Sequence, residues 1–216
     1  MDFIDVAIIG GGPAGLPAAG ALARQLFTAV VFDTQTYRNK NSAHMHMDFR
    51  AATKDNILAR YSTIQFFDMG VTRVEKKTDS HFILVDANAK EWNFRKIILA
   101  VVPTVFSASA MKTTARNLQA FSRTAFSPLI KTPFKIDTRK IQRLVDNGGS
   151  SVIIHFSDGS EKEEAFLVHN PKTTVQGSFI KQLGLDLSPA GDFLAPPPFH
   201  QTSVRGVFAA GDCITP

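Results

Sequence analysis

The stretch FIDVAIIGGGPAG, residues 3–15, decides the fold of this chain. Its first half, Phe3–Ile9, is an apolar run with Val and Ile, which predicts a buried strand. After the glycines, Ala18–Phe27 has the composition of a helix, and Thr28–Phe32 predicts a second strand that ends in Asp33. The order strand, glycine turn, helix, strand is typical of the first unit of a Rossmann-type parallel sheet.

The glycine turn fits the G-x-G-x-x-G pattern of dinucleotide-binding proteins. Gly10 lets the chain turn tightly, Gly12 leaves room for a pyrophosphate beside the backbone, and Gly15 lets the helix pack closely on the sheet. The N–H groups and the positive dipole end of the helix would face the phosphates. We therefore predict cofactor-binding residues in this turn: Gly10, Gly12, Pro13, Ala14 and Gly15.

Asp33 stands roughly 20 residues after the glycines, where a carboxylate accepts hydrogen bonds from the hydroxyls of a ribose. A 2′-phosphate would be repelled there, so Asp33 favours FAD or NAD over NADP. The alternative is an ordinary glycine-rich turn with Asp33 at the end of a strand.

Composition excludes several classes of protein. The chain has 216 residues, 44% of them hydrophobic, and a single cysteine, which excludes an intramolecular disulfide, a Cys-x-x-Cys redox pair and a cysteine-rich zinc site. No spacing of His, Asp and Glu suggests a metal site. The eighteen phenylalanines predict an aromatic interior or pocket.

The charge pattern argues against nucleic acid and membrane partners. Net charge is +5, but the basic residues are scattered, and pairs such as Lys76-Lys77 and Arg139-Lys140 indicate a solvated face. No apolar run reaches the roughly 20 residues of a membrane span. Asp2 and Asp5 stand where a signal peptide would be basic, so we expect a cytoplasmic protein.

A second motif stands near the other end of the sequence. The apolar run Val207–Ala210 predicts a short strand, and Gly211-Asp212 follows it directly. This arrangement resembles the second FAD fingerprint of the flavoprotein disulfide reductases. The resemblance implies that Asp212 holds the ribityl chain of FAD and that Gly211 lets the backbone approach it. Together with the first motif it favours FAD over NAD.

Further segments in the same order narrow the resemblance: residues 37–39 (YRN), 44–46 (HMH), 49–52 (FRAA), 57–61 (ILARY), 134–137 (FKID), 155–160 (HFSDGS) and 166–171 (FLVHNP). With these segments the chain resembles the fungal thioredoxin-reductase-like flavoproteins, which include the gliotoxin-type dithiol oxidases of secondary metabolism. The resemblance implies an α/β fold: a glutathione-reductase-type, FAD-binding Rossmann domain with a parallel sheet and a β-meander.

The resemblance also implies a domain that this chain lacks. The family inserts an NADPH domain with its own glycine loop and a Cys-x-x-Cys pair. Here residues 103–133 contain no glycine. We therefore expect one FAD-binding domain over residues 1–216, with a first segment at 1–103, a short replacement at 104–132 and a second segment at 133–216.

Further elements are expected from local pattern. Polar turns separate the strands of a predicted meander, Val71–Glu75, Phe82–Val85, Trp92–Phe94 and Ile97–Ala100. Asp158-Gly159 is a strong hairpin signal between two predicted strands, Ser151–Phe156 and Ala165–His169. A helix is possible over Met111–Ala125.

Histidine is the most frequent general base near neutral pH, so the candidate catalytic residues are His46, His200 and His44. His44 and His46 belong to a motif that lies near the flavin in the resembling family, and His200 stands close in sequence to the Gly-Asp motif. Each has a structural or surface role as its alternative. Cys213 has no cysteine partner, and we expect it to be a small buried residue.

The leading interpretation is an FAD-dependent oxidase or dehydrogenase. It would oxidise a small, apolar molecule of fungal secondary metabolism without NADPH and with oxygen or another acceptor. The alternative is a non-redox cyclase or isomerase in which the flavin is structural or lost. A third reading is a non-catalytic remnant or binding partner. We expect apolar surface to be covered in a homodimer.

Overall fold

The computed structural model describes residues 3–37, 43–101, 104–105, 137–146, 151–164 and 173–214, with only the backbone course given for 43–48, 104–105, 146 and 173. The predicted helix at Met111–Ala125 lies outside these residues. The chain forms two compact units: Met1–Thr104 with Thr173–Pro216, and Val105–Lys172. The first unit resumes at Thr173, and the expectation of one FAD-binding domain over residues 1–216 stays a prediction.

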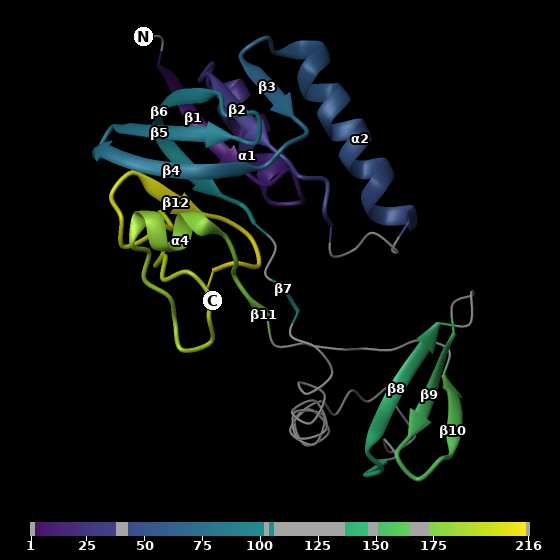
Figure 1. The fold of residues 1–216 in the computed structure, drawn as a ribbon. Coiled ribbons are helices and arrows are strands. Elements are labelled where there is room, and N and C mark those ends of the chain that lie inside the picture. Colours follow the sequence, from purple (N-terminus) through teal and green to yellow (C-terminus); the bar gives the residue numbers. More distant parts are fainter. Residues whose placement is uncertain are drawn as a thin grey trace. The chain divides into compact units, whose positions relative to one another are not determined.

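A seven-stranded sheet forms the centre of the first unit (Figure 1). Its order is β3-β2-β1-β6-β5-β4, and β12 also pairs with β6. The strands are β1 Ile4–Ile9, β2 Ala29–Phe32, β3 Ile64–Phe67, β4 Val71–Thr78, β5 His81–Asp86, β6 Glu91–Leu99 and β12 Val207–Ala209. The pairs among β1, β2, β3, β6 and β12 are parallel, whereas β4, β5 and β6 form an antiparallel meander. This confirms the predicted combination of a parallel sheet and a meander.

The long strand β6 belongs to both parts of the sheet. We predicted two strands, Trp92–Phe94 and Ile97–Ala100, but Glu91–Leu99 is continuous. Phe94 pairs with Phe82 on the antiparallel side and with Ile4 on the parallel side. Because both neighbours supply ladder hydrogen bonds, the polar residues in the middle of β6 do not interrupt it.

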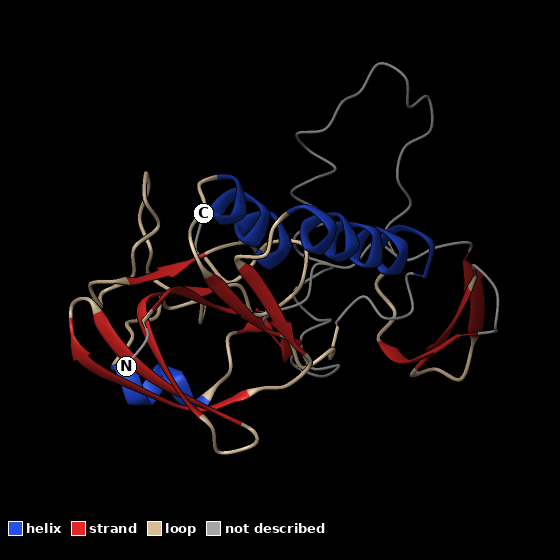
Figure 2. Ribbon diagram, turned by 90° about the horizontal axis from the view of Figure 1, so that it is seen from above, coloured by secondary structure: helices blue, strands red, loops and turns tan. Residues whose placement is uncertain are grey.

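Helices cover the parallel strands on one side. They are α1, Gly15–Arg24, and α2, Ala43–Arg60, while the short α4, Ser178–Leu183, lies on the other side (Figure 2). The helix predicted at Ala18–Phe27 begins and ends three residues earlier, because Leu26 has a φ of 61° and turns the chain toward β2.

Both faces of β1 are buried, as expected for a parallel strand between helices and a second layer. Val6 and Ile8 pack in one core cluster with Ala19 of α1 and Ile57 of α2. The other cluster contains Ala7 and Ile9 of β1 together with aromatic side chains of the meander, of α4 and of the C-terminal segment. Its members include Phe32, Phe82, Trp92, Phe94, Phe179 and Phe193.

The predicted aromatic interior is therefore a packed core within the described residues. Phe32, Phe82, Phe94 and Phe193 are each no more than 2% exposed. The ring of Phe32 lies 5.8 Å from that of Trp92 and 6.1 Å from that of Phe94, both edge to face. Each such buried ring stabilises the fold by roughly 1.5–3 kcal/mol.

The second unit contains an antiparallel sheet of order β10-β9-β8. The strands are β8 Ile141–Asp146, β9 Val152–Phe156 and β10 Glu161–Glu164. The predicted turn at Asp158-Gly159 is confirmed, and Gly159 has a φ of 83°. The strand that pairs with β9 after this turn is Glu161–Glu164, and the predicted strand Ala165–His169 lies outside the described residues. Outside this sheet, the short strand β7, Thr104–Val105, pairs with β11, Thr173–Thr174, which belongs to the first unit.

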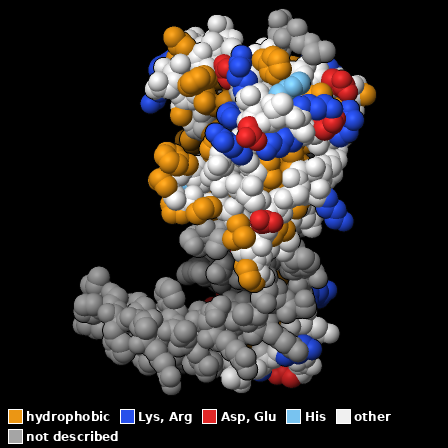
Figure 3. Space-filling model, turned by 90° about the vertical axis from the view of Figure 1, so that its left-hand side faces the viewer, with side chains coloured by type: hydrophobic (Ala, Val, Ile, Leu, Met, Phe, Trp, Pro, Cys, Tyr) orange, Lys and Arg blue, Asp and Glu red, His pale blue; other side chains and the backbone are white. Residues whose placement is uncertain are grey.

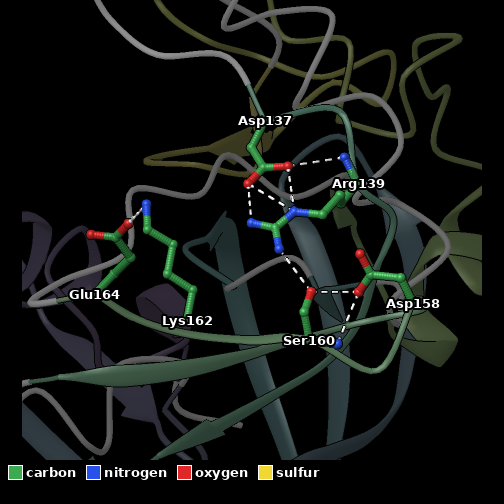
Figure 4. A network of polar contacts seen from close by, with 6 residues as sticks. All are labelled: Asp137, Arg139, Asp158, Ser160, Lys162 and Glu164. Carbon is green, nitrogen blue, oxygen red and sulfur yellow. Dashed lines mark hydrogen bonds and ion pairs between the residues drawn. The ribbon is translucent and has the colours of Figure 1, made fainter.

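A polar network joins the beginning of β8 to the β9–β10 turn (Figure 4). The guanidinium of Arg139 donates to both carboxylate oxygens of Asp137 and, at 2.7 Å, to the hydroxyl of Ser160. The hydrogen bond from Arg139 lowers the pKa of Asp137 to about 2. Asp158 accepts from Ser160, and Arg139 lies 3.8 Å from the ring centre of Phe156. The polar groups of this network are exposed and form hydrogen bonds with one another, which favours a structural role at this end of the sheet.

Candidate functional site

The candidate site lies where the parallel strands of the first unit end. In register, Ile9 of β1 pairs with Phe32 of β2 and with Leu99 of β6, and Leu99 pairs with Ala209 of β12. The residues that follow these strands therefore leave the same edge of the sheet. The carboxyl edge of a parallel sheet is where α/β proteins bind their ligands.

The glycine turn is packed so closely against backbone atoms that side chains are excluded at two positions, and a Cβ at Gly11 would lie 2.4 Å from Oδ2 of Asp33. At Gly10 the φ is 111°, and a Cβ would lie 2.3 Å from the carbonyl oxygen of Ala100. At Gly15 a Cβ would lie 1.9 Å from the carbonyl oxygen of Gly10. The turn and the first residue of α1 can approach each other and the end of β6 only because both residues are glycine.

Gly12 is different, because a Cβ there would meet nothing within 4 Å. Its backbone borders open space at the beginning of α1, a helix of ten residues. The N-terminus of a helix presents N–H groups and a positive dipole end, so it favours an anion. The open backbone at Gly12 and the helix end together form a cradle for a phosphate group.

The second motif meets the first one at this cradle. Gly211 follows β12 with a φ of 82°, and a Cβ on it would lie 2.7 Å from the Cβ of Ala14. Two segments almost 200 residues apart in the sequence thus lie against each other. Asp212, next to Gly211, is exposed.

Asp33 ends β2 at the same edge, as predicted, and its carboxylate is held by two local donors. One oxygen accepts from the backbone N–H of Gln35 at 3.0 Å, and the other accepts from the hydroxyl of Tyr37 at 2.5 Å. Burial, followed by the hydrogen bond to Asp33, raises the pKa of Tyr37 above its ordinary value. The phenol, which is protonated at neutral pH in any case, therefore remains a donor at higher pH as well.

A cavity of about 200 Å³ opens beside Asp33. Its wall includes Tyr37 together with Arg50 and Lys54 of α2 and Asp68, which follows β3. Lys54 forms an ion pair with Asp68 at 3.4 Å. Ligand pockets commonly measure roughly 300–1,000 Å³. This cavity is smaller than that range, so it suits one end of a dinucleotide and not the whole molecule.

The structure describes the candidate catalytic histidines less completely than the glycine motifs. His44 and His46 lie at the beginning of α2, and their side chains are outside the described residues. His200 is exposed and has a φ of 51°. Its carbonyl oxygen accepts from the N–H of Ala209, so it lies alongside β12. The described residues therefore place His200 near the segment that carries Gly211, without joining it to Asp33.

The single cysteine is buried, as predicted. Cys213 is 0% exposed and packs in the aromatic core cluster, with its sulfur 3.2 Å from the carbonyl oxygen of Ala210. Burial raises the pKa of its thiol to about 11. A thiol of this kind is a poor nucleophile at neutral pH.

Of the residues that line the cavity, only Asp33 was predicted as a site residue. Tyr37 and Arg50 belong to segments that carry the family resemblance, but neither was predicted to have a role in the site. The signal at Tyr37 is weak, a tyrosine four residues after the strand-ending acid. Arg50 gives no signal on its own, because its position beside Tyr37 depends on how α2 packs.

Other kinds of site find no support in the described part of the chain. No group of three or more His, Cys, Asp or Glu side chains that could hold a metal ion occurs among those residues. None of the helices described there combines the length and apolar character needed to cross a bilayer. On the face drawn in Figure 3, Lys and Arg side chains with some Asp and Glu among them cover part of the surface, and hydrophobic side chains gather along one side.

Comparison with known proteins identifies the family, although no family profile matches the chain. The thioredoxin reductase sirT of Leptosphaeria maculans is 32% identical over 287 residues, covering 99% of this chain and 88% of that protein. The thioredoxin reductase aclD of Aspergillus oryzae is 33% identical over 280 residues, covering 98% of this chain and 88% of that protein.

Solved structures agree in fold. The putative thioredoxin reductase TrxB of Bacillus anthracis has a TM-score of 0.70 at 20% identity and covers 97% of this chain and 90% of its own. An oxidoreductase of Agrobacterium tumefaciens has a TM-score of 0.75 at 20% identity, covering 99% and 90%. With two glycine motifs meeting at the carboxyl edge of the sheet and such relatives, the chain belongs to the fungal thioredoxin-reductase-like oxidoreductases.

Proposed function

We propose that this protein binds FAD and, without using NADPH, oxidises a small, apolar molecule of fungal secondary metabolism, with oxygen or another acceptor as the final oxidant. The observation that carries the proposal is the contact between Gly211 and Ala14, where a Cβ on Gly211 would lie 2.7 Å from that of Ala14. A Rossmann turn alone suits NAD as well as FAD. A second glycine and an aspartate beside that turn suit the longer FAD.

The residues present fit the cofactor at its adenosine and phosphate end. The open backbone at Gly12 and the beginning of α1 would receive the pyrophosphate, and Asp33 would accept from the ribose. Asp212 would accept from the ribityl chain. FAD, when bound, would supply the acceptor for the electrons of the substrate, and the protein would orient the reactants and move protons.

Independence of NADPH is supported by what the sequence leaves out. The alignment with sirT extends over 287 residues, whereas this chain has 216, so part of that relative has no counterpart here. Residues 103–133 contain no glycine for a second phosphate loop. The single cysteine cannot form a dithiol pair within the chain, and its thiol is buried. The absence of a second glycine loop and the absence of a dithiol pair favour direct oxidation of the substrate.

His200 is the candidate base with a described side chain. Its Nδ1 lies 3.0 Å from the carbonyl oxygen of Ala195, which can only accept, so Nδ1 carries the proton of the neutral ring. The basic nitrogen is then Nε2, which is free to take a proton from a substrate. Phe199, next to it in sequence, is 79% exposed, which suits an apolar substrate. His46 and His44 stay as further candidates.

The test begins with the purified protein. We expect flavin absorbance near 450 nm, either as purified or after adding FAD, and release of FAD when the protein is denatured. Under anaerobic conditions NADPH should leave the flavin oxidised. A protein that neither carries nor takes up FAD would refute the proposal, and turnover without oxygen and without flavin reduction would indicate a cyclase or isomerase instead.

A further inference from the structure

The carboxylate of Asp33 is oriented by a chain of contacts that begins in α2. Its two oxygens accept from the N–H of Gln35 at 3.0 Å and from the hydroxyl of Tyr37 at 2.5 Å. An ionised carboxylate has about four acceptor positions. Two therefore remain on Asp33, which borders the cavity of about 200 Å³. Two is the number that the neighbouring hydroxyls of one ribose require.

Tyr37 is itself fixed from the other side of its ring. The guanidinium of Arg50 lies 3.2 Å from the ring centre, and Arg50 is only 9% exposed. A buried, planar cation over an aromatic face is a favourable and directional contact. Because Arg50 belongs to α2 and Tyr37 to the segment after β2, this contact ties the two elements together at the cavity.

The second cation of the cavity wall is engaged elsewhere. Lys54 pairs with Asp68 at 3.4 Å, so the charges around the cavity consist of two basic and two acidic groups. Such a balanced wall suits an uncharged nucleoside better than one with an additional phosphate. Tyr37 is a donor at neutral pH, as any phenol is, and burial and Asp33 raise its pKa, so that it stays a donor in more alkaline solution as well.

We propose that Tyr37 and Arg50 are positioning residues, which hold the Asp33 carboxylate in the orientation that receives the adenosine ribose of a bound dinucleotide. The proposal rests on the proposed binding of FAD and adds the residues that determine its affinity at the adenosine end. Arg50 acts on the ring of Tyr37, and Tyr37 acts on the carboxylate.

The first test measures FAD affinity by flavin fluorescence in the full chain. Tyr37→Phe removes only the donor to Asp33 and should weaken FAD binding at least about tenfold, the lower limit for one hydrogen bond to a charged group. The matched control is Tyr61→Phe, at the only other tyrosine of the chain, which lies at the end of α2 outside the cavity wall and should leave the affinity unchanged. An unchanged or tighter affinity in Tyr37→Phe would overturn the proposal.

The second test separates an oriented carboxylate from a general loss of structure. ADP and 2′-deoxy-ADP compete with FAD, and the wild type should prefer ADP about tenfold, because the deoxy compound lacks one partner of Asp33. In Tyr37→Phe the preference should fall below about threefold, since a carboxylate that rotates freely reads the hydroxyl less well. Equal preferences in both proteins would contradict the assigned role.

The third test addresses Arg50. Arg50→Met should weaken FAD binding and Arg50→Lys should restore part of it, whereas Arg50→Met should add nothing in a Tyr37→Phe background, because both residues act through one carboxylate. Additive losses would overturn the chain of contacts. Tyrosine absorbance gives a readout without flavin: Asp33→Asn should lower the pKa of Tyr37 toward its ordinary value.

Failure of the two proposals can be distinguished. A wild type that binds neither FAD nor ADP refutes dinucleotide binding and the positioning role with it. A wild type that binds FAD, with variants that bind it equally well, refutes the positioning role alone.

Discussion

Substituting Gly12 by alanine separates cofactor binding from folding. The new methyl group would meet no protein atom within 4 Å, and Gly12 is not among the glycines with positive φ. The apo protein should therefore keep its stability or gain about 0.4–1 kcal/mol, because alanine restricts the unfolded chain. For a chain of this size the gain corresponds to an increase in melting temperature of roughly 1–4 °C.

The same methyl group should interfere with FAD, because it would occupy the space that we assign to the pyrophosphate. Forcing a methyl group into a filled space costs about 1–3 kcal/mol. That range corresponds to a roughly 5- to 150-fold weaker affinity. FAD titration followed by flavin fluorescence measures the affinity, and thermal unfolding of the apo protein measures the stability.

The matched variant is Gly15→Ala, which should behave in the opposite way. Its Cβ would lie 1.9 Å from the carbonyl oxygen of Gly10, so the backbone must shift. We expect a loss of about 1–3 kcal/mol or more in the free energy of unfolding. A stable Gly12→Ala protein that binds FAD like the wild type would refute the placement of the pyrophosphate. A Gly12→Ala apo protein that melts several degrees lower would refute the reading of the open space.

Three further predictions concern the core, the acid response and the assembly. The thiol of Cys213, with a pKa of about 11, should be ionised in about one molecule in a thousand at pH 8, so it should react with a thiol reagent only after unfolding. Fast labelling of the native protein would contradict the burial of Cys213. The hydrogen bond from Trp92 lowers the pKa of Asp86, so the ionised carboxylate stabilises the fold above pH ~4 and this stabilisation is lost on acidification. The free energy of unfolding of Asp86→Asn in urea should therefore depend less on acid than that of the wild type. Leu194 and Phe199 are 43% and 79% exposed on one loop, and we expect a homodimer to cover these apolar side chains. Light scattering should detect that dimer in the wild type and a weaker dimer in the double variant Leu194→Ser/Phe199→Ser. A monomeric wild type would refute the prediction.

The elements that sequence predicts best are those whose evidence is local. The strand, the glycine turn and the helix at residues 3–27 follow one another directly, and the structure differs only by a few residues at the ends of α1. The break predicted in the middle of β6 shows the limit. Arg95 and Lys96 look like a turn in the sequence, but strands on both sides hold the backbone extended. The conformation of β6 is therefore decided by strands that are distant from it in the sequence.

The extent of the second unit cannot be predicted from local sequence patterns, for a related reason. The hairpin around Gly159 is recognisable from its turn residues, and that local pattern is the same in whichever unit the hairpin packs. Its assignment depends on contacts over the whole range Val105–Lys172. The position of Arg50 beside Tyr37 likewise depends on helix packing, which no periodicity in the sequence expresses.

The meeting of the two glycine motifs shows how the core determines the candidate site. β12 has three residues, of which Val207 and Ala209 are buried and Phe208 is only partly so. Because side chains alternate along a strand, a shift of one residue against β6 would turn Val207 and Ala209 away from the core cluster. The apolar alternation therefore fixes the register of β12, and that register carries Gly211 to Ala14 two residues later. A polar substitution at Val207 should thus disturb FAD binding through register, although the side chain has no part in the cradle itself.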